Sequence, residues 1–300
     1  MSEKLSNLIN KCLPLYKGRE ACDNCVNNKK CQTKESCKCY DSCIYPLHRN
    51  NNCSHVYNCK NMALNYVIKH FYRFASEIAY AFRSIFYLEK ENWKDTINVV
   101  SLGCGLCSEL YGIVDELERQ GSDLKVNYRG FDLNDIWSDI WNLNKEICND
   151  YELKFHNCDT FEYYNDNPNS HIDVLVLNYL LSDIARKKGD DKTAFLDKLV
   201  SFIDQNDIRY IIFNDIPLFY GNLNSGYSCM EYVINQFGVN KKTESDLVAS
   251  RWRFSEPKQF QPTYGRKRKS SAILYTIYET AKDFEPFDYC NGIQMIVRKN

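Results

Sequence analysis

The residues best suited to bind a ligand follow four apolar segments between residues 96 and 183. They comprise a glycine turn, two pairs that begin with an aspartate, and a polar loop, each placed where an apolar run ends. In chain order they are Gly103, Cys104 and Gly105; Asp132 and Leu133; Asp159 and Thr160; and Asn178 with Asp183. Glycine lets a backbone approach a ligand closely, and carboxylates and amides form directional hydrogen bonds.

A nucleoside is the ligand that this pattern favours. A helix that begins after a glycine turn presents free N–H groups, and an acid after a second strand accepts hydrogen bonds from ribose hydroxyls. Asp159, after the third run, suits an adenine amino group. Each feature also has a plainer interpretation, because paired glycines form tight turns and Asp132 or Asp159 can cap a helix.

Alternating strands and helices must position these residues. The apolar runs at 97–105, 125–134, 152–160, 171–181 and 209–217 predict strands. Helices are predicted over residues 108–121, through Trp137 and Trp141, and around residues 191–205. Continuous apolar strands joined by helices are typical of a parallel sheet buried on both faces. The carboxyl ends of such strands meet at one edge, where open α/β sheets bind ligands. Two later runs, at 270–279 and 292–300, predict an antiparallel pair at the end of the sheet.

The order of these features over residues 96–215 resembles the core of class I S-adenosylmethionine (SAM) dependent methyltransferases. The resemblance implies an α/β fold with a seven-stranded Rossmann-like sheet over residues 96–300, SAM as cofactor, and methyltransferase activity. In that family the glycine turn holds the methionine part of SAM, the acid after strand two the ribose, and the residue after strand three the adenine. The implied cofactor contacts are Gly103, Cys104, Gly105, Asp132, Leu133, Asp159, Thr160 and Asn178.

The sequence departs from this family in two places. The third glycine of the turn is replaced, and Asn178 is not followed by the Pro-Pro-aromatic motif of many amino-group methyltransferases. No catalytic base stands out. Asn178, Asp183 and Asp215 are the candidate catalytic residues, and the two aspartates could act as bases or else be helix caps or loop residues. Methyl transfer depends largely on alignment, because SAM is already activated.

Two alternatives to a methyltransferase stay open. A scaffold with the same fold and no turnover is one, and a SAM-dependent reaction of another kind is the second, because cofactor motifs do not encode the chemistry. A nicotinamide-dependent dehydrogenase is disfavoured, since Ser108 stands where the dinucleotide motif has its third glycine.

Cysteines concentrate at the N-terminus, where nine of the 15 precede residue 60. Mixed Cys and His ligands at short spacings indicate tetrahedral zinc, and the set would suit two ions. The predicted ligands are Cys22, Cys25, Cys31, Cys37, Cys39, Cys43, His55 and Cys59. Their order is loosely similar to MYND-type zinc fingers, although the second Cys-x-x-Cys pair is missing. Free thiols, disulfides and an iron–sulfur cluster are the alternatives.

Three segments follow from this reading. Residues 1–60 form a cysteine-rich module with little apolar periodicity, residues 61–95 form a connecting helix with one apolar stripe, and residues 96–300 form the SAM-binding domain. The cysteine-rich module suggests that the substrate is a macromolecule, either nucleic acid or protein.

Charge is distributed unevenly along the chain. The net charge is −1 overall, but it is +6 over residues 1–95, −12 over 96–240 and +5 over 241–300. The basic run Arg266, Lys267, Arg268 and Lys269 is a candidate contact for nucleic acid phosphates, or else an exposed loop. The cysteine-rich module is a candidate protein contact. No apolar run is long enough to span a bilayer, so we expect a cytoplasmic protein without membrane contact, or a nuclear one in a eukaryote.

Overall fold

The computed structural model describes residues 3–16, 60–187, 190–216, 223–237, 247–255, 267–269, 290 and 292–299. Its strands are β1 (Thr96–Leu102), β2 (Lys125–Phe131), β3 (Glu152–His156), β4 (His171–Asn178), β5 (Asp207–Asp215), β6 (Leu247–Ser255), β7 (Lys267–Lys269) and β8 (Ile293–Lys299). Its helices are α1 (Glu3–Cys12), η1 (Leu13–Leu15), α3 (Lys60–Glu89), α4 (Ser108–Arg119), η5 (Asp135–Trp137), α5 (Ser138–Ile147), α6 (Thr160–Asn165), α7 (Leu181–Ala185), α8 (Asp191–Gln205) and α9 (Gly226–Gln236).

The strands form one sheet in the order β3-β2-β1-β4-β5-β8-β6-β7. Strands β1 to β5 pair in parallel, and β8 runs antiparallel to both β5 and β6. From β1 the chain adds β2 and β3 on one side, and then adds β4 and β5 on the other side of β1. The boundary between β1 and β4 is therefore the switch point where Rossmann-like sheets bind ligands. The register places Leu102 of β1 beside Phe131 of β2 and Leu177 of β4, so these strands end at one level.

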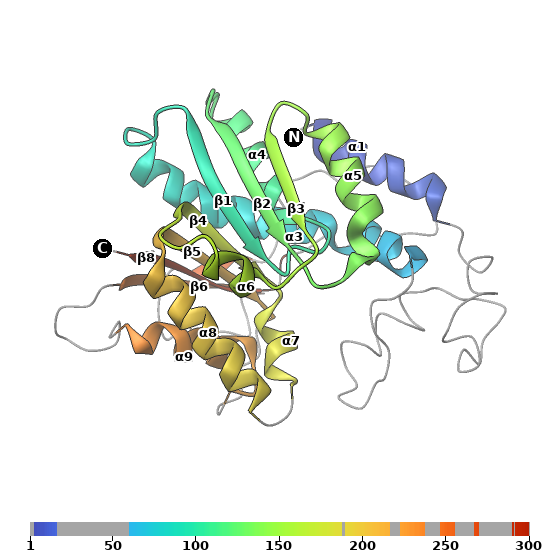
Figure 1. The fold of residues 1–300 in the computed structure, drawn as a ribbon. Helices are drawn as coiled ribbons and strands as arrows, with labels where there is room; N and C mark the ends of the chain where they lie inside the picture. The colour runs from blue at the N-terminus through green and yellow to red at the C-terminus, as the bar shows by residue number, and fades with distance from the viewer. Residues whose placement is uncertain are drawn as a thin grey trace, which may run out of the picture.

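Helices cover both faces of the sheet (Figure 1). Alternate residues of a strand point to opposite faces. Val99 therefore packs with α1, α3, α4 and α5, while Val100 packs with α6 to α9. The two apolar layers explain why the central strands read as continuous apolar runs, and they confirm the prediction of a parallel sheet buried on both sides.

Helix α3 is part of one of these layers. The sequence predicted a helix over residues 61–90, and the structure confirms it at Lys60–Glu89. It packs closely against α4, since a Cβ on Gly112 would lie 2.5 Å from the carbonyl oxygen of Ala75. The Arg83 guanidinium also donates to both carboxylate oxygens of Glu116, at 2.7 and 2.8 Å. This helix therefore covers the sheet as well as leading into β1.

Helix α1 lies within the first 60 residues, where we expected little apolar periodicity. That expectation is wrong for residues 3–12, because Leu5, Leu8, Ile9 and Cys12 form a buried stripe. The stripe belongs to the same apolar layer as α3 and α5. Residues 3–12, at the start of the N-terminal segment, thus pack on the sheet domain.

The C-terminal strands differ from the prediction in number and partner. The described residues contain eight strands in the sheet instead of seven, and neither β6 nor the short β7 was predicted. The antiparallel direction of β8 is confirmed, but its partners are β5 and β6, which occupy both of its edges. The expected partner at 270–279 lies outside the described residues. None of the helices described is long and apolar enough to cross a membrane.

Candidate functional site

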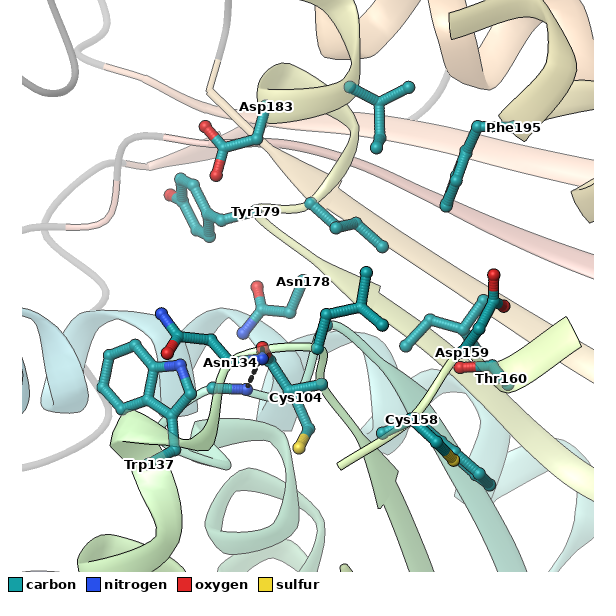
Figure 2. Close-up of a pocket in the computed structure, with 18 of the residues that line it drawn as sticks. Cys104, Asn134, Trp137, Cys158, Asp159, Thr160, Asn178, Tyr179, Asp183 and Phe195 are labelled. Atoms are coloured by element: carbon teal, nitrogen blue, oxygen red, sulfur yellow. Dashed lines mark hydrogen bonds between the residues drawn. The ribbon is translucent and has the colours of Figure 1, made fainter. Parts of the chain in front are cut away.

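A cavity of about 530 Å³ opens at the carboxyl ends of β1, β2, β3 and β4. Figure 2 shows it with the side chains that surround it. Every residue predicted to contact the cofactor lines this cavity: Gly103, Cys104, Gly105, Asp132, Leu133, Asp159, Thr160 and Asn178. Asp183 lines it as well. The volume is in the range of small-molecule sites.

The glycine turn between β1 and α4 forms one wall of the cavity. Gly103 and Gly105 have φ values of +63° and +46°, a region that disfavours residues with a side chain. A Cβ on Gly103 would also lie 2.8 Å from Cδ1 of Leu180. The turn therefore requires glycine at position 103 for its conformation and for the space in front of the loop after β4.

Asp132 supports this turn from the end of β2. Its carboxylate accepts hydrogen bonds from the amides of Gly105 at 3.0 Å and Asn134 at 2.9 Å, one on each oxygen. Burial raises the pKa of Asp132, and these two amides offset part of the rise. Because a carboxylate has about four acceptor positions, Asp132 can still accept from a ligand in the cavity.

Asp159 caps the short helix α6, as the plainer interpretation of this residue proposed. Its Oδ1 accepts from the amide of Phe161 at 2.8 Å. Its Oδ2 lies 3.9 Å from Nζ of Lys198. Capping uses only one oxygen, so the second stays accessible to a hydrogen-bond donor in the cavity.

Asn178 ties the ends of several elements together. Its Nδ2 donates to Oγ of Ser108 at 3.0 Å, and its Oδ1 accepts from Nδ2 of Asn214 at 2.8 Å. Nδ2 of Asn214 also donates to Glu77 of α3 at 2.8 Å. The Asn178 side chain thus links β4, β5 and the start of α4 and holds the cavity floor in place.

Tyr179 belongs to the predicted polar loop after β4, but the sequence analysis did not single it out. It has a φ of +57°, which is unusual for an aromatic residue. Its hydroxyl donates to Oε2 of Glu77 and accepts from a guanidinium nitrogen of Arg73, both at 2.8 Å. The signal for this contact was present in the sequence, because Arg73 and Glu77 are two charged residues one turn apart inside an apolar helix.

The side chains around the cavity form two groups. In Figure 2, Asn134, Trp137, Tyr179 and Asp183 gather on one side, while Cys158, Asp159, Thr160 and Phe195 lie on the other. Aromatic side chains of α3 complete the first group, where the ring centroids of Phe74 and Tyr179 are 4.1 Å apart. The exposed Leu133 and the buried Phe161 add apolar surface to the wall.

The candidate bases Asp183 and Asp215 occupy different environments. The Asp183 side chain is 45% exposed and lies 3.3 Å from the Arg186 guanidinium. Its partial burial in the cavity raises its pKa, and Arg186 offsets part of this rise. Asp215 is fully buried, does not line the cavity, and accepts from the amides of Ser182 and Ile216 at 2.7 Å each. Burial raises the pKa of Asp215 to about 7.

The predicted zinc ligands Cys22, Cys25, Cys31, Cys37, Cys39, Cys43, His55 and Cys59 lie outside the described residues. Within the described part of the chain, no group of three or more His, Cys, Asp or Glu residues could hold a metal ion. Of the basic run, Arg266 also lies outside, while Lys267, Arg268 and Lys269 form β7 at the edge of the sheet. The zinc site and the nucleic acid contact stay predictions.

Comparisons with known proteins found solved structures that match this chain at low sequence identity. No family model and no curated protein matches the sequence. The plantazolicin methyltransferase BpumL, in complex with a triazolic desmethylPZN analog and SAH, is 11% identical over 100% of both chains, with a TM-score of 0.43. An O-methyltransferase from Bacillus cereus in complex with SAH is 10% identical over 74% of this chain and 80% of that chain, with a TM-score of 0.42.

A Listeria monocytogenes chain assigned to the class I S-adenosylmethionine-dependent methyltransferases is 12% identical, with a TM-score of 0.41. The match covers 74% of this chain and 59% of that one. The case for a function therefore depends on the cavity itself.

Proposed function

We propose that this chain binds SAM in the cavity and transfers its methyl group to a substrate. One observation carries the proposal: the glycine turn, Asp132, Asp159 and the loop after β4 converge on one cavity at the switch point of the sheet. These elements are separated in sequence, and each was expected to contact a different part of the cofactor.

The chemistry of the cavity suits a cationic nucleoside. Its acidic side chains Asp132, Asp159, Asp183 and Asp191 outnumber its basic side chains Lys187 and Lys198. An excess of carboxylates stabilises a positive ligand in a site of reduced dielectric. Asp132 retains acceptor positions for ribose hydroxyls, and Asp159 retains one oxygen for an adenine amino group. The apolar side chains of Leu133 and Phe161 offer a surface for the base.

The proposed cofactor would supply an activated methyl group attached to a sulfonium centre. The chain would then act mainly by positioning, which accounts for much of the rate enhancement of such reactions. Asn178 is suited to this task, because its hydrogen bonds to Ser108 and Asn214 fix the cavity floor. Asp183 is the candidate base that lines the cavity, and its partial burial there raises its pKa, which makes it a stronger proton acceptor.

Two features of the sequence bear on the substrate. A macromolecule is favoured by the cysteine-rich segment, predicted to bind two zinc ions, and by the basic run that includes Lys267. The alternative of a scaffold without turnover predicts SAM binding with no methylated product. Incubation of the protein with SAM carrying a labelled methyl group and a heat-inactivated cell extract separates the two, since only an active enzyme then transfers the label. The same extract without the protein gives the background.

Calorimetric titration with SAM and S-adenosylhomocysteine (SAH) tests the cofactor site directly. We expect both to bind, with weaker binding in Asp132→Asn. Asp139→Asn is a matched control, because Asp139 is exposed, lies outside this cavity and pairs with Lys60. Failure of the folded wild-type protein to bind either compound would contradict the proposal.

A further inference from the structure

Two cysteines, Cys104 and Cys107, flank Gly105 and Leu106 in the glycine turn. Cys104 and Cys107 form a Cys-x-x-Cys sequence within the loop from β1 to α4. The two side chains lie close enough for each thiol to affect the pKa of the other, and neither cysteine forms a disulfide. Neither thiol has a part in the proposed methyl transfer.

The backbone of this loop already brings the two residues together. The amide of Cys107 donates to the carbonyl oxygen of Cys104 at 2.7 Å, which closes a four-residue turn. In such a turn the terminal Cα atoms are less than about 7 Å apart, close to the spacing of roughly 4.4–6.8 Å that disulfides require. A disulfide then requires side-chain rotations that bring the two sulfurs to the bond length of about 2.05 Å.

One residue of this pair borders the cavity. Cys104 is 4% exposed and lines the cavity, whereas Cys107 is fully buried behind it. A Cys-x-x-Cys pair at the start of a helix beside a βαβ unit is typical of redox-active dithiols. Among the described residues, no other two cysteines have this spacing.

We propose that Cys104 and Cys107 are a redox-modification site, an oxidisable dithiol within the turn that forms the cavity wall. A hydroperoxide is the oxidant. The two thiols lose two electrons and two protons and form one S–S bond, while the O–O bond of the hydroperoxide breaks and yields an alcohol and water, or two waters from hydrogen peroxide. A dithiol reductant reverses the step.

The disulfide acts on the cavity through Gly105, which lies between the two cysteines. The Gly105 amide donates to Asp132 at 3.0 Å, and its carbonyl oxygen accepts from the Trp141 indole at 2.9 Å and from the Cys107 thiol at 3.6 Å. Oxidation removes the thiol donor and draws the ends of the turn together. This consequence depends on the proposed function, since the same turn is expected to hold SAM. We expect the oxidised protein to bind SAH at least tenfold more weakly.

Burial sets the rate of the reaction. It raises the pKa of both thiols, and the thiolate is the reactive form. The pair therefore reacts slowly compared with an exposed low-pKa cysteine, and prolonged treatment is needed.

Peptide mapping tests the dithiol. The purified full chain is treated with hydrogen peroxide, unfolded in guanidinium with iodoacetamide, and digested with trypsin. The tryptic peptide 95–119 contains Cys104 and Cys107 and no other cysteine. We expect it to lose two hydrogens and take up no alkyl group after oxidation, and to take up two alkyl groups after dithiothreitol. Cys107→Ser is the matched variant, in which this peptide cannot form the internal bond.

The outcomes separate the modification from the cofactor. A peptide that still takes up two alkyl groups after prolonged treatment overturns the dithiol, whatever the protein does with SAH. An internal disulfide with unchanged SAH affinity overturns its effect on the cavity. An internal disulfide in a protein that binds no SAH in either redox state supports the modification site and contradicts the proposed function instead.

Discussion

The amide of Gly105 donates a hydrogen bond to Oδ2 of Asp132 across 3.0 Å, which joins the glycine turn to the end of β2. Two features that the sequence places 27 residues apart therefore form one unit. The carboxylate fixes the turn through Oδ2, and its oxygens retain acceptor positions for a ligand. A ribose-binding acid in this arrangement also sets the conformation of the loop that is expected to hold the rest of the cofactor.

Replacing Asp132 should weaken SAH binding and also lower the free energy of unfolding. Asp132→Ala removes the expected ribose acceptor and leaves the Gly105 amide without its partner. Hydrogen bonds to charged groups contribute about 1.5–3 kcal/mol, so we expect an affinity loss of roughly 10- to 150-fold. Calorimetry gives the affinity, and urea unfolding gives the free energy of unfolding as a check. Equal affinity in the variant would remove Asp132 from the site.

Gly103 and Gly121 offer a matched pair of substitutions. Their φ values are +63° and +64°, so Ala at either position costs about 1–2 kcal/mol of backbone strain. A Cβ on Gly121 meets nothing within 4 Å, whereas one on Gly103 would lie 2.8 Å from Leu180. We expect Gly103→Ala to lose both stability and SAH binding, and Gly121→Ala to lose stability alone.

Adding Leu180→Ala to Gly103→Ala checks the cause of this difference. Removal of the leucine opens the space that the new Cβ needs, so part of the lost stability should return. No recovery in the double variant would mean that the backbone conformation, rather than the contact with Leu180, limits position 103.

The sequence predicts the parts of the site that depend on local pattern. Strands β1 to β5 follow from continuous apolar runs, and parallel strands bring their carboxyl ends to one edge. The placement of Asp132, Asp159 and Asn178 around one cavity follows from that geometry alone. Cofactor contacts remain predictions, although the positions of these residues were predictable.

The parts that were not predicted depend on contacts between distant segments. Helix α1 belongs to a segment that is polar and cysteine-rich as a whole. Its short apolar stripe was recognisable as part of the core only from its packing in the same layer as α3 and α5. The alternation of side chains along β8 predicts a strand, but it does not predict which strands lie beside it, because each edge of β8 can pair with any strand that has a free edge. Tyr179 became a candidate only when Arg73 and Glu77 of α3 were found at its hydroxyl.

Tyr179→Phe tests that buried contact. The substitution removes two hydrogen bonds to charged groups and leaves Arg73 and Glu77 each with one partner fewer. We expect a loss of about 1.5–3 kcal/mol in the free energy of unfolding, measured in urea. Tyr87→Phe is the control, because Tyr87 is 57% exposed and its hydroxyl donates to Gln120 at the surface. Similar losses in both variants would show that burial does not strengthen the Tyr179 contact.

Asp215 should make stability depend on pH. Burial raises its pKa from the usual 3.8 to about 7, so between these values the folded chain holds a proton that the unfolded chain has released. Stability therefore falls as pH rises through this window, by up to about 4 kcal/mol at 1.36 kcal/mol per pKa unit. Asp215→Asn lacks this titration, and its free energy of unfolding should vary less between pH 4.5 and about 7 in urea experiments. The exposed control Asp139→Asn should keep the wild-type profile. If Asp215→Asn also keeps it, the Asp215 carboxyl titrates near its ordinary value, and the two amides of Ser182 and Ile216 compensate fully for its burial.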